Sequence, residues 1–186
     1  MKETKFRTAG LCIEFSSIPK GYVAMNLVEP KSGVSILEGS PVSPGKFLLT
    51  MDGDEKSLTS YLERVKSACG SSLLDCAVLH PLNENLFLGL YGLLKTPLSD
   101  LLIISETITT SSGLSFANKT LNDHSIQLIE FRSPRGIGGK SIAYFTAQAV
   151  AKSDLEKHFK FHGCTFEIID NIGAPLRSFF DLNVSF

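Results

Sequence analysis

Two kinds of hydrophobic spacing alternate along the chain. Apolar residues at every second position, or in short runs bounded by Gly, Pro or Asp, predict strands, and apolar residues three or four positions apart predict helices. Asp54 is a good N-cap for one such helix, whose apolar face consists of Leu58, Tyr61, Leu62, Val65 and Cys69. The elements predicted for the first half are a strand at 10–15, a helix at 21–28 that Pro30 stops, strands at 34–38 and 46–51, the helix after Asp54, a strand at 73–79 and a helix at 84–94.

The second half of the chain repeats this order. Leu114, Ala117 and Leu121 form the apolar stripe of its first helix, and Ser153 with Glu156 is the predicted capping box of its second. Its predicted strands are 101–105, 126–132, 140–146 and 165–169. The order β-α-β-β-α-β is that of a ferredoxin-like unit, here with an added terminal helix.

Short matches between the two halves indicate a duplication. Residues 14–21 match 106–113 in the spacing from an acidic residue to a glycine, at an offset of 92. Two further matches have an offset of 94, which a two-residue insertion explains: Gly45-Lys46 with Gly139-Lys140, and His80-Pro81-Leu82 with Ala174-Pro175-Leu176. We therefore predict an α+β protein of two tandem ferredoxin-like domains, residues 8–95 and 98–182, joined near residues 95–97.

Composition and charge argue against several classes of protein. The 186 residues are 43% hydrophobic and carry a net charge of −1, with a pI near 6.4, which argues against a nucleic-acid-binding surface. No apolar run approaches the roughly 20 residues of a membrane span, and residues 1–10 lack the apolar core of a secretory signal. Four cysteines without paired spacing indicate reduced thiols. We expect a cytoplasmic protein that binds neither nucleic acid nor membranes.

Residues 134–141 (Pro-Arg-Gly-Ile-Gly-Gly-Lys-Ser) partly match a phosphate-binding loop. Pro134 takes the place of the first glycine and removes a backbone donor. The residues after Lys140 predict a strand, whereas a phosphate-binding loop opens a helix. The pattern therefore favours a tight loop between two strands.

Histidine and cysteine side chains provide two further candidates for chemistry. His158, His162 and Cys164 have a spacing at which a metal could bind, but zinc needs three or four ligands and no second group of ligands accompanies them. Cys76 and His80, four residues apart on a strand, would be about 13 Å apart at ~3.3 Å per residue, which is beyond hydrogen-bond reach. We predict no metal site and no catalytic residues.

Five short segments carry a resemblance to a known family. They are 43–49 (Ser-Pro-Gly-Lys-Phe-Leu-Leu), 53–54 (Gly-Asp), 80–81 (His-Pro), 106–107 (Glu-Thr) and 136–140 (Gly-Ile-Gly-Gly-Lys). On these segments and the duplication, the chain resembles the tandem-domain shell proteins of bacterial microcompartments over residues 11–176. Within that family it is most similar to the propanediol-utilisation shell trimer that can carry an iron–sulfur cluster.

The resemblance implies a structural function without catalysis. Such chains form homotrimers that imitate hexagonal discs, and the discs tile with other shell proteins into a shell around enzymes. The loop between the second and third strands of each unit faces the central axis and lines a pore for small polar metabolites. The residues predicted to line the pore are Ser40, Pro41, Val42, Ser43, Pro44, Gly45, Arg135, Gly136, Ile137, Gly138 and Gly139.

Two features depart from the family pattern. Ser43 stands where cluster-bearing relatives have a cysteine, and a hydroxyl is a poor iron ligand, so we predict no iron–sulfur cluster and no other cofactor. Ser43 with Arg135 nearby would suit a small polar or anionic metabolite; alternatively, Ser43 bonds its own loop and the pore is shut. Pro30 and Asn122 occupy the positions of the family's edge lysines, so tiling would need other contacts.

Two other functions compete with the shell hypothesis. Duplicated ferredoxin-like domains can also form regulatory modules that bind a small molecule between the domains. An enzyme is the other competing hypothesis, and its only candidate is Lys140 acting with Asp or His partners. A stable trimer favours the shell, and a monomer with a ligand-dependent melting temperature favours the regulatory module.

Overall fold

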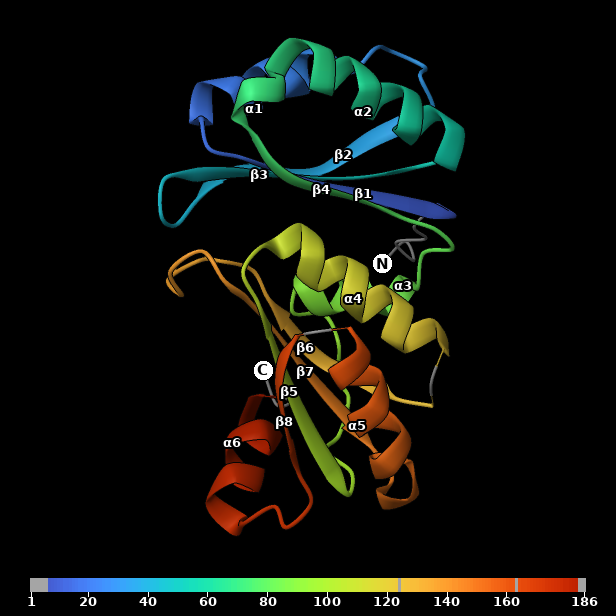
Figure 1. Ribbon diagram of the computed structural model, residues 1–186, viewed down its shortest axis with the longest axis vertical. Helices are drawn as coiled ribbons and strands as arrows, with labels where there is room; N and C mark the ends of the chain where they lie inside the picture. The colour runs from blue at the N-terminus through green and yellow to red at the C-terminus, as the bar shows by residue number, and fades with distance from the viewer. Residues whose placement is uncertain (1–6, 124, 163, 184–186) are drawn as a thin grey trace.

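The computed structural model describes residues 7–123, 125–162 and 164–183, which form two similar units stacked one on the other (Figure 1). The first unit consists of β1 (Ala9–Phe15), α1 (Ile18–Asn26), β2 (Val34–Val42), β3 (Lys46–Gly53), α2 (Glu55–Cys69), a 3-10 turn (Gly70–Ser72), β4 (Leu73–Leu79) and α3 (Glu84–Leu90). The second consists of β5 (Leu101–Thr107), α4 (Thr110–Asp123), β6 (Gln127–Arg132), β7 (Ser141–Ala147), a 3-10 turn (Ala149–Ala151), α5 (Lys152–Phe161), β8 (Thr165–Ile169) and α6 (Ala174–Asn183).

Each unit contains one four-stranded antiparallel sheet. The strand orders are β2-β3-β1-β4 and β6-β7-β5-β8, which confirms the predicted α+β fold of two ferredoxin-like units. Within the described residues, no helix is long and apolar enough to cross a membrane.

Local signals placed some element boundaries correctly and others wrongly. Asp54 caps α2 by accepting a hydrogen bond from the Ser57 backbone N–H at 2.9 Å, as predicted. The predicted start of the first helix at Gly21 was wrong, because Ser17 caps α1 and Pro19 fits its first turn. The capping box at Ser153 was also wrong, because α5 begins at Lys152 directly after a 3-10 turn.

The hydrogen-bond register of the two sheets demonstrates the duplication. Each second strand carries a bulge at the equivalent place, between Ile36 and Glu38 in β2 and between Leu128 and Glu130 in β6. The paired residues Ala9 and Gly53 correspond to Leu101 and Ala147, so the offset changes from 92 to 94. The two inserted residues therefore lie in the β6–β7 loop.

The third predicted match between the halves was wrong. Gly10 pairs with Leu79 in the first sheet, and Leu102 pairs with Ile169 in the second. The offset at the last strand is therefore 90, not 94, so Ala174-Pro175-Leu176 is not the counterpart of His80-Pro81-Leu82. Sequence similarity of a Pro-Leu pair was too short a signal to fix this alignment.

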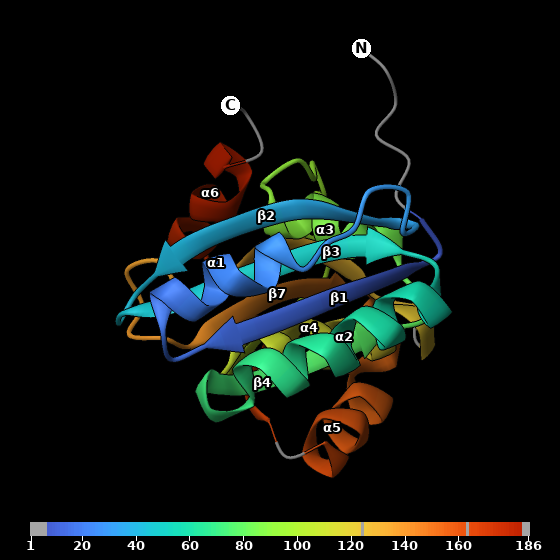
Figure 2. The ribbon, with the colours of Figure 1, turned by 90° about the horizontal axis from the view of Figure 1, so that it is seen from above.

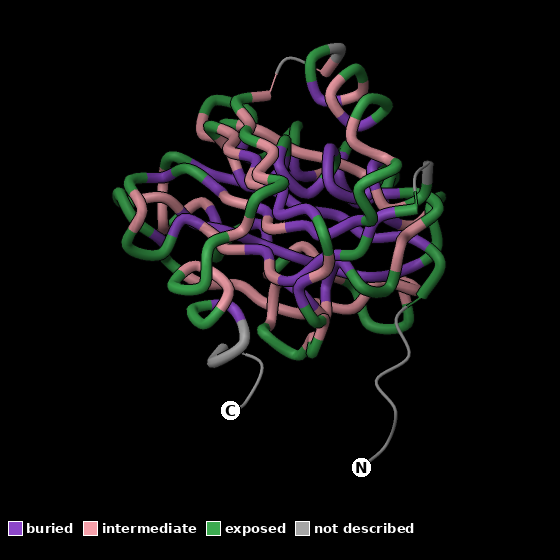
Figure 3. Tube along the Cα trace, turned by 90° about the horizontal axis from the view of Figure 1, so that it is seen from below, coloured by how far each residue is buried: buried purple, intermediate pink, exposed green. Residues whose placement is uncertain are grey.

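Helix α4 of the second unit lies between the two sheets (Figures 1 and 2). Alternate residues of β1 point to opposite faces of the first sheet. Leu11, Ile13 and Phe15 pack under α1 and α2, whereas Cys12 packs in a core shared with the second unit. A third, smaller core joins the far face of the second sheet to α6 through Phe180. Buried residues accordingly lie toward the middle of the molecule in the view of Figure 3, and exposed residues lie toward its periphery.

Candidate functional site

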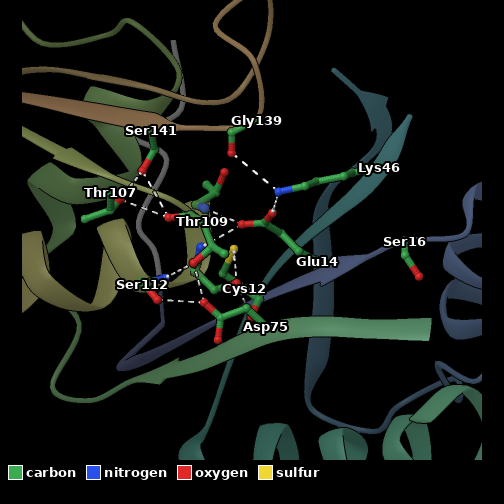
Figure 4. A network of polar contacts seen from close by, with 12 residues as sticks. Cys12, Glu14, Ser16, Lys46, Asp75, Thr107, Thr109, Ser112, Gly139 and Ser141 are labelled. Atoms are coloured by element: carbon green, nitrogen blue, oxygen red, sulfur yellow. Dashed lines mark hydrogen bonds and ion pairs between the residues drawn. The ribbon is translucent and has the colours of Figure 1, made fainter. Parts of the chain in front are cut away.

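A buried carboxylate joins the two units. Glu14 of β1 has no exposed surface and accepts hydrogen bonds from the backbone N–H groups of Thr110 and Ser111, the latter at 3.1 Å (Figure 4). The Lys46 ammonium lies 3.2 Å from its other oxygen. The first turn of α4 has unpaired N–H groups and a partial positive charge, so an anion there is stabilising. Glu14 therefore fastens the N-terminus of α4 to the first sheet.

Further polar contacts follow α4 along the first sheet. Asp75 of β4 accepts hydrogen bonds from the hydroxyls of Ser112, at 2.7 Å, and Thr109. Asn118 accepts from the backbone N–H of Asn83 at 2.8 Å and donates to the carbonyl of Pro81 at 3.0 Å. Polar contacts between the units are thus present from the first turn of α4 to its later part, at Asn118.

The second sheet carries an unused copy of the same feature. Glu106 and Lys140 are the counterparts of Glu14 and Lys46 in register, and they also form an ion pair, at 2.6 Å. The side chain of Glu106 is 37% exposed, whereas that of Glu14 is completely buried. No helix N-terminus covers Glu106 within the described chain. One of two equivalent surfaces is therefore occupied and the other is open.

Helix α1 shows the complementary pattern. Tyr22 of α1 is the counterpart of Leu114 of α4, at the offset of 92. Leu114 is fully buried in the core shared by both units, whereas Tyr22 is 54% exposed. Pro19, the counterpart of the buried Ser111, is also exposed. The face of α1 that corresponds to the buried face of α4 is an exposed apolar surface.

The β2–β3 and β6–β7 loops lie side by side on one side of the molecule (Figures 1 and 2). A Cβ atom at Gly139 would be 2.9 Å from Cδ of Pro44, and the Lys46 ammonium donates to the Gly139 carbonyl at 3.5 Å. Gly45 and Gly139 both have positive φ, 75° and 87°, which favours glycine at these positions. Equivalent loops of the two units therefore touch each other.

The predicted pore-lining residues are divided between a strand and these loops. Ser40, Pro41 and Val42 belong to β2, which is longer than predicted because its pairing with β3 continues to Val42. Val42 and Gly139 are buried and Ile137 is half-buried. The exposed members in the loops are Ser43, Pro44, Gly45, Arg135, Gly136 and Gly138. That they line a pore stays a prediction.

Arg135 reaches from the β6–β7 loop to β2 of the other unit. Its guanidinium forms an ion pair with Glu38 and donates to the Ser40 hydroxyl at 3.0 Å. The sequence did not reveal this contact, because it joins residues that are 97 positions apart. It also missed the role of Glu14, although a lone carboxylate among the apolar residues of a strand was a visible signal.

The other candidates for chemistry are occupied by structural contacts. Ser141 begins strand β7 and Lys140 pairs with Glu106, which bears out the interpretation of residues 134–141 as a loop between strands. His158 Nε2 is 2.9 Å from the Thr120 hydroxyl, and the rings of His158 and His162 contact each other and the ring of Phe116. Among the described residues, no three His, Cys, Asp or Glu side chains are grouped so that they could hold a metal.

A hollow of about 510 Å³ lies between the units, beside β4 and the end of α5. Two thiols, Cys76 and Cys164, line it together with Phe116 and Lys119. Burial raises the pKa of both thiols, that of Cys164 to about 11. Burial also raises the pKa of Cys12, which packs under α4. The thiols are therefore protonated, weakly nucleophilic groups at neutral pH.

The positions predicted to stand in for the edge lysines lie in different surroundings. Pro30 is exposed in the segment after α1. The Asn122 side chain is used inside the chain, where it donates to the Pro81 carbonyl at 2.9 Å and accepts from the Asn83 amide at 3.0 Å. Asn122 therefore belongs to the contact between the units.

Comparisons with known proteins agree with the predicted family. No protein-family model matches the chain. The bacterial microcompartment shell protein PduT of Citrobacter freundii is 27% identical over 128 residues, which are 69% of this chain and 70% of that protein. The crystal structure of a microcompartments protein from Desulfitobacterium hafniense covers 91% of this chain and 98% of its own, with a TM-score of 0.79 and 23% identity. The predicted resemblance and the predicted tandem fold are confirmed.

Proposed function

We propose that this chain is a structural shell protein of a bacterial microcompartment, and that it acts by assembly and selective passage of metabolites without catalysis. The likeness in sequence to a shell protein and in fold to a microcompartments protein supports the proposal. The observation that carries it furthest is the pair of equivalent surfaces, of which one is filled within the chain and the other is open.

The open surfaces are suited to join identical chains head to tail. Helix α1 of one copy would pack on the second sheet of the next, as α4 packs on the first sheet within the chain. The Ile18 N–H would then approach Glu106 as the Thr110 N–H approaches Glu14. A head-to-tail contact of this kind repeats until a ring closes. Three chains supply six units, and the family resemblance implies this homotrimer.

The contact between the two loops supports an opening at the ring axis. Points related by a rotation lie closest together near the rotation axis. The β2–β3 and β6–β7 loops are equivalent and touch, through Gly139 and Pro44, so the axis that relates the units passes near them. A closed ring would gather three copies of each loop there, with Ser43 to Gly45 and Arg135 to Gly139 around the opening.

The residues at the loops do not suit an iron–sulfur cluster. Clusters are held by thiolates, and Ser43 offers a hydroxyl. Cys12, Cys69, Cys76 and Cys164 all lie away from the β2–β3 and β6–β7 loops, in strands β1 and β4, at the end of α2 and before β8. We therefore propose a passage for small polar metabolites rather than an electron-transfer site.

Light scattering on a size-exclusion column tests the proposal. We expect a particle of three chains of 20.2 kDa each. Tyr22→Glu should give a folded monomer, because it places a charge on the exposed apolar face of α1. Val150→Glu is the matched control, since Val150 is also an exposed apolar residue (89%) but lies before α5, and it should leave the trimer intact. A wild-type monomer would overturn the shell proposal and favour the regulatory module.

A further inference from the structure

Arg135, Glu38 and Ser40 form a polar cluster that joins the β6–β7 loop to strand β2. The Arg135 guanidinium donates to the Glu38 carboxylate and to the Ser40 hydroxyl, the latter at 3.0 Å. The Ser40 hydroxyl donates to the same Glu38 oxygen at 2.7 Å. Glu38 is only 20% exposed, although Arg135 is 60% exposed. The charge of the less exposed carboxylate is therefore compensated, through Oε1, by an arginine from the other unit.

In the second unit, the equivalent carboxylate pairs with an arginine of its own strand. Glu130 is the counterpart of Glu38, and Arg132 is the counterpart of Ser40, at the offset of 92. Arg132 binds Glu130 through two nitrogens, at 2.9 and 3.0 Å. The first unit has serine where this arginine stands. Its carboxylate is neutralised by Arg135, from the loop that contains the two inserted residues.

Every charged side chain in and beside these loops has a partner. Over residues 38–46 and 130–140 the ion pairs are Glu38–Arg135, Glu130–Arg132, Lys46–Glu14 and Lys140–Glu106. The loop tips themselves consist of uncharged residues, Ser43 to Gly45 and Gly136 to Gly139. Three copies of Arg135 at a common axis would attract anions only if their charge were free.

We propose that Glu38 sets the charge of the opening. By holding Arg135 it keeps the rim neutral, so the opening suits uncharged polar solutes and does not concentrate anions. This inference rests on the proposed ring, because only there do three copies of the loop meet. Of the small polar or anionic metabolite expected for Ser43 with Arg135 nearby, it keeps the uncharged polar solute and excludes the anion.

Calorimetric titration with citrate, an anion with three carboxylates, at low ionic strength tests the role of Glu38. Wild-type trimer should bind citrate weakly. Glu38→Gln should bind it at least about tenfold more tightly, with one citrate per three chains, because three freed guanidinium groups converge. Glu38→Gln with Arg135→Gln should return to the wild-type level. Glu63→Gln is the control, since it also removes the carboxylate of an ion pair, with Lys66, but on helix α2 outside these loops, and it should stay within about twofold of wild type.

Failure of this inference is distinguishable from failure of the proposed function. Trimers of wild type and Glu38→Gln that bind citrate equally would overturn the role of Glu38 and leave the shell proposal standing. One citrate per chain in the Glu38→Gln trimer would mean that the arginines do not converge, which also overturns it. A wild-type monomer in light scattering would remove the ring itself.

Discussion

Glu14 carries a carboxylate at a position with no exposure to solvent, in a strand of otherwise uncharged residues. Burying an ion is costly unless opposite charge and hydrogen bonds replace water. Lys46 and two backbone N–H groups of α4 supply that replacement here. The stability of the contact between the units therefore depends strongly on the Glu14 side chain.

We expect Glu14→Gln to lower the free energy of unfolding by about 3 kcal/mol, because it leaves Lys46 without its buried partner. Urea denaturation followed by circular dichroism measures the loss. Glu63→Gln is a suitable control, since Glu63 pairs with Lys66 on the exposed face of α2, and no measurable change is expected. Equal losses of unfolding free energy for the two substitutions would show that the buried ion pair stabilises the fold no more than the exposed one.

Cys164 provides a prediction of pH dependence. Desolvation raises the pKa of its thiol from the ordinary 9.0 to about 11, and only the thiolate reacts with alkylating reagents. Its alkylation by iodoacetamide should therefore be slow at neutral pH and should still be rising steeply above about pH 10, where the rate of a free cysteine peptide levels off. Mass spectrometry of the labelled peptide measures the rate, and a plateau by about pH 10 would contradict the argument.

The first helices of the two units pack unusually close to the sheets. Gly21 of α1 and Gly113 of α4 are equivalent, and a Cβ atom at either would lie less than 3.0 Å from the third strand of its unit, at Phe47 or Ser141. Glycine at these two positions lets each helix lie directly on its strand. The acid-to-glycine spacing shared by the two halves thus has a physical cause.

Gly113→Ala should lower the free energy of unfolding by about 1–3 kcal/mol, because the added methyl group overpacks the contact with Thr107 and Ser141. Gly70→Ala is the control. A Cβ atom added at Gly70 would meet nothing within 4 Å, and φ there is −51°, so the unfolding free energy should change little or rise slightly. Thermal denaturation of both variants provides the comparison, and a loss at Gly70 as large as that at Gly113 would refute the packing argument.

Elements with strong local signals were predictable and long-range contacts were not. Residues 73–79 and 165–169 were predicted with the observed bounds of β4 and β8, because short apolar runs there end at turn residues. The start of α1 at Ile18 depends on the cap at Ser17, a polar signal that apolar spacing does not contain. The pairing of Arg135 with Glu38 depends on how the two units pack, which no local window contains.

The largest hydrophobic core belongs to both units at once. Cys12 and Leu48 of the first sheet lie in the same core as Leu114 of α4 and Phe145 of the second sheet. Neither unit can unfold without exposing apolar surface of the other. The two units should therefore behave as one cooperative body although each has its own sheet.

Differential scanning calorimetry of the Tyr22→Glu monomer, which separates folding from assembly, should show a single transition. The calorimetric enthalpy should equal the van't Hoff enthalpy, as two-state unfolding requires. Glu14→Gln in the same background should lower the midpoint without splitting the peak. Two resolved transitions would show that the shared core does not couple the units.

Because residue 40 is serine, the first unit depends on Arg135 of the second unit to neutralise Glu38. A ring built from six second halves would bring each Glu130 together with its own Arg132. A ring built from six first halves would gather six Glu38 carboxylates without the arginine that now neutralises them, because Ser40 supplies no charge. In the proposed ring, a first unit therefore depends on the arginine of a second unit to neutralise its Glu38, whereas a second unit carries its own arginine.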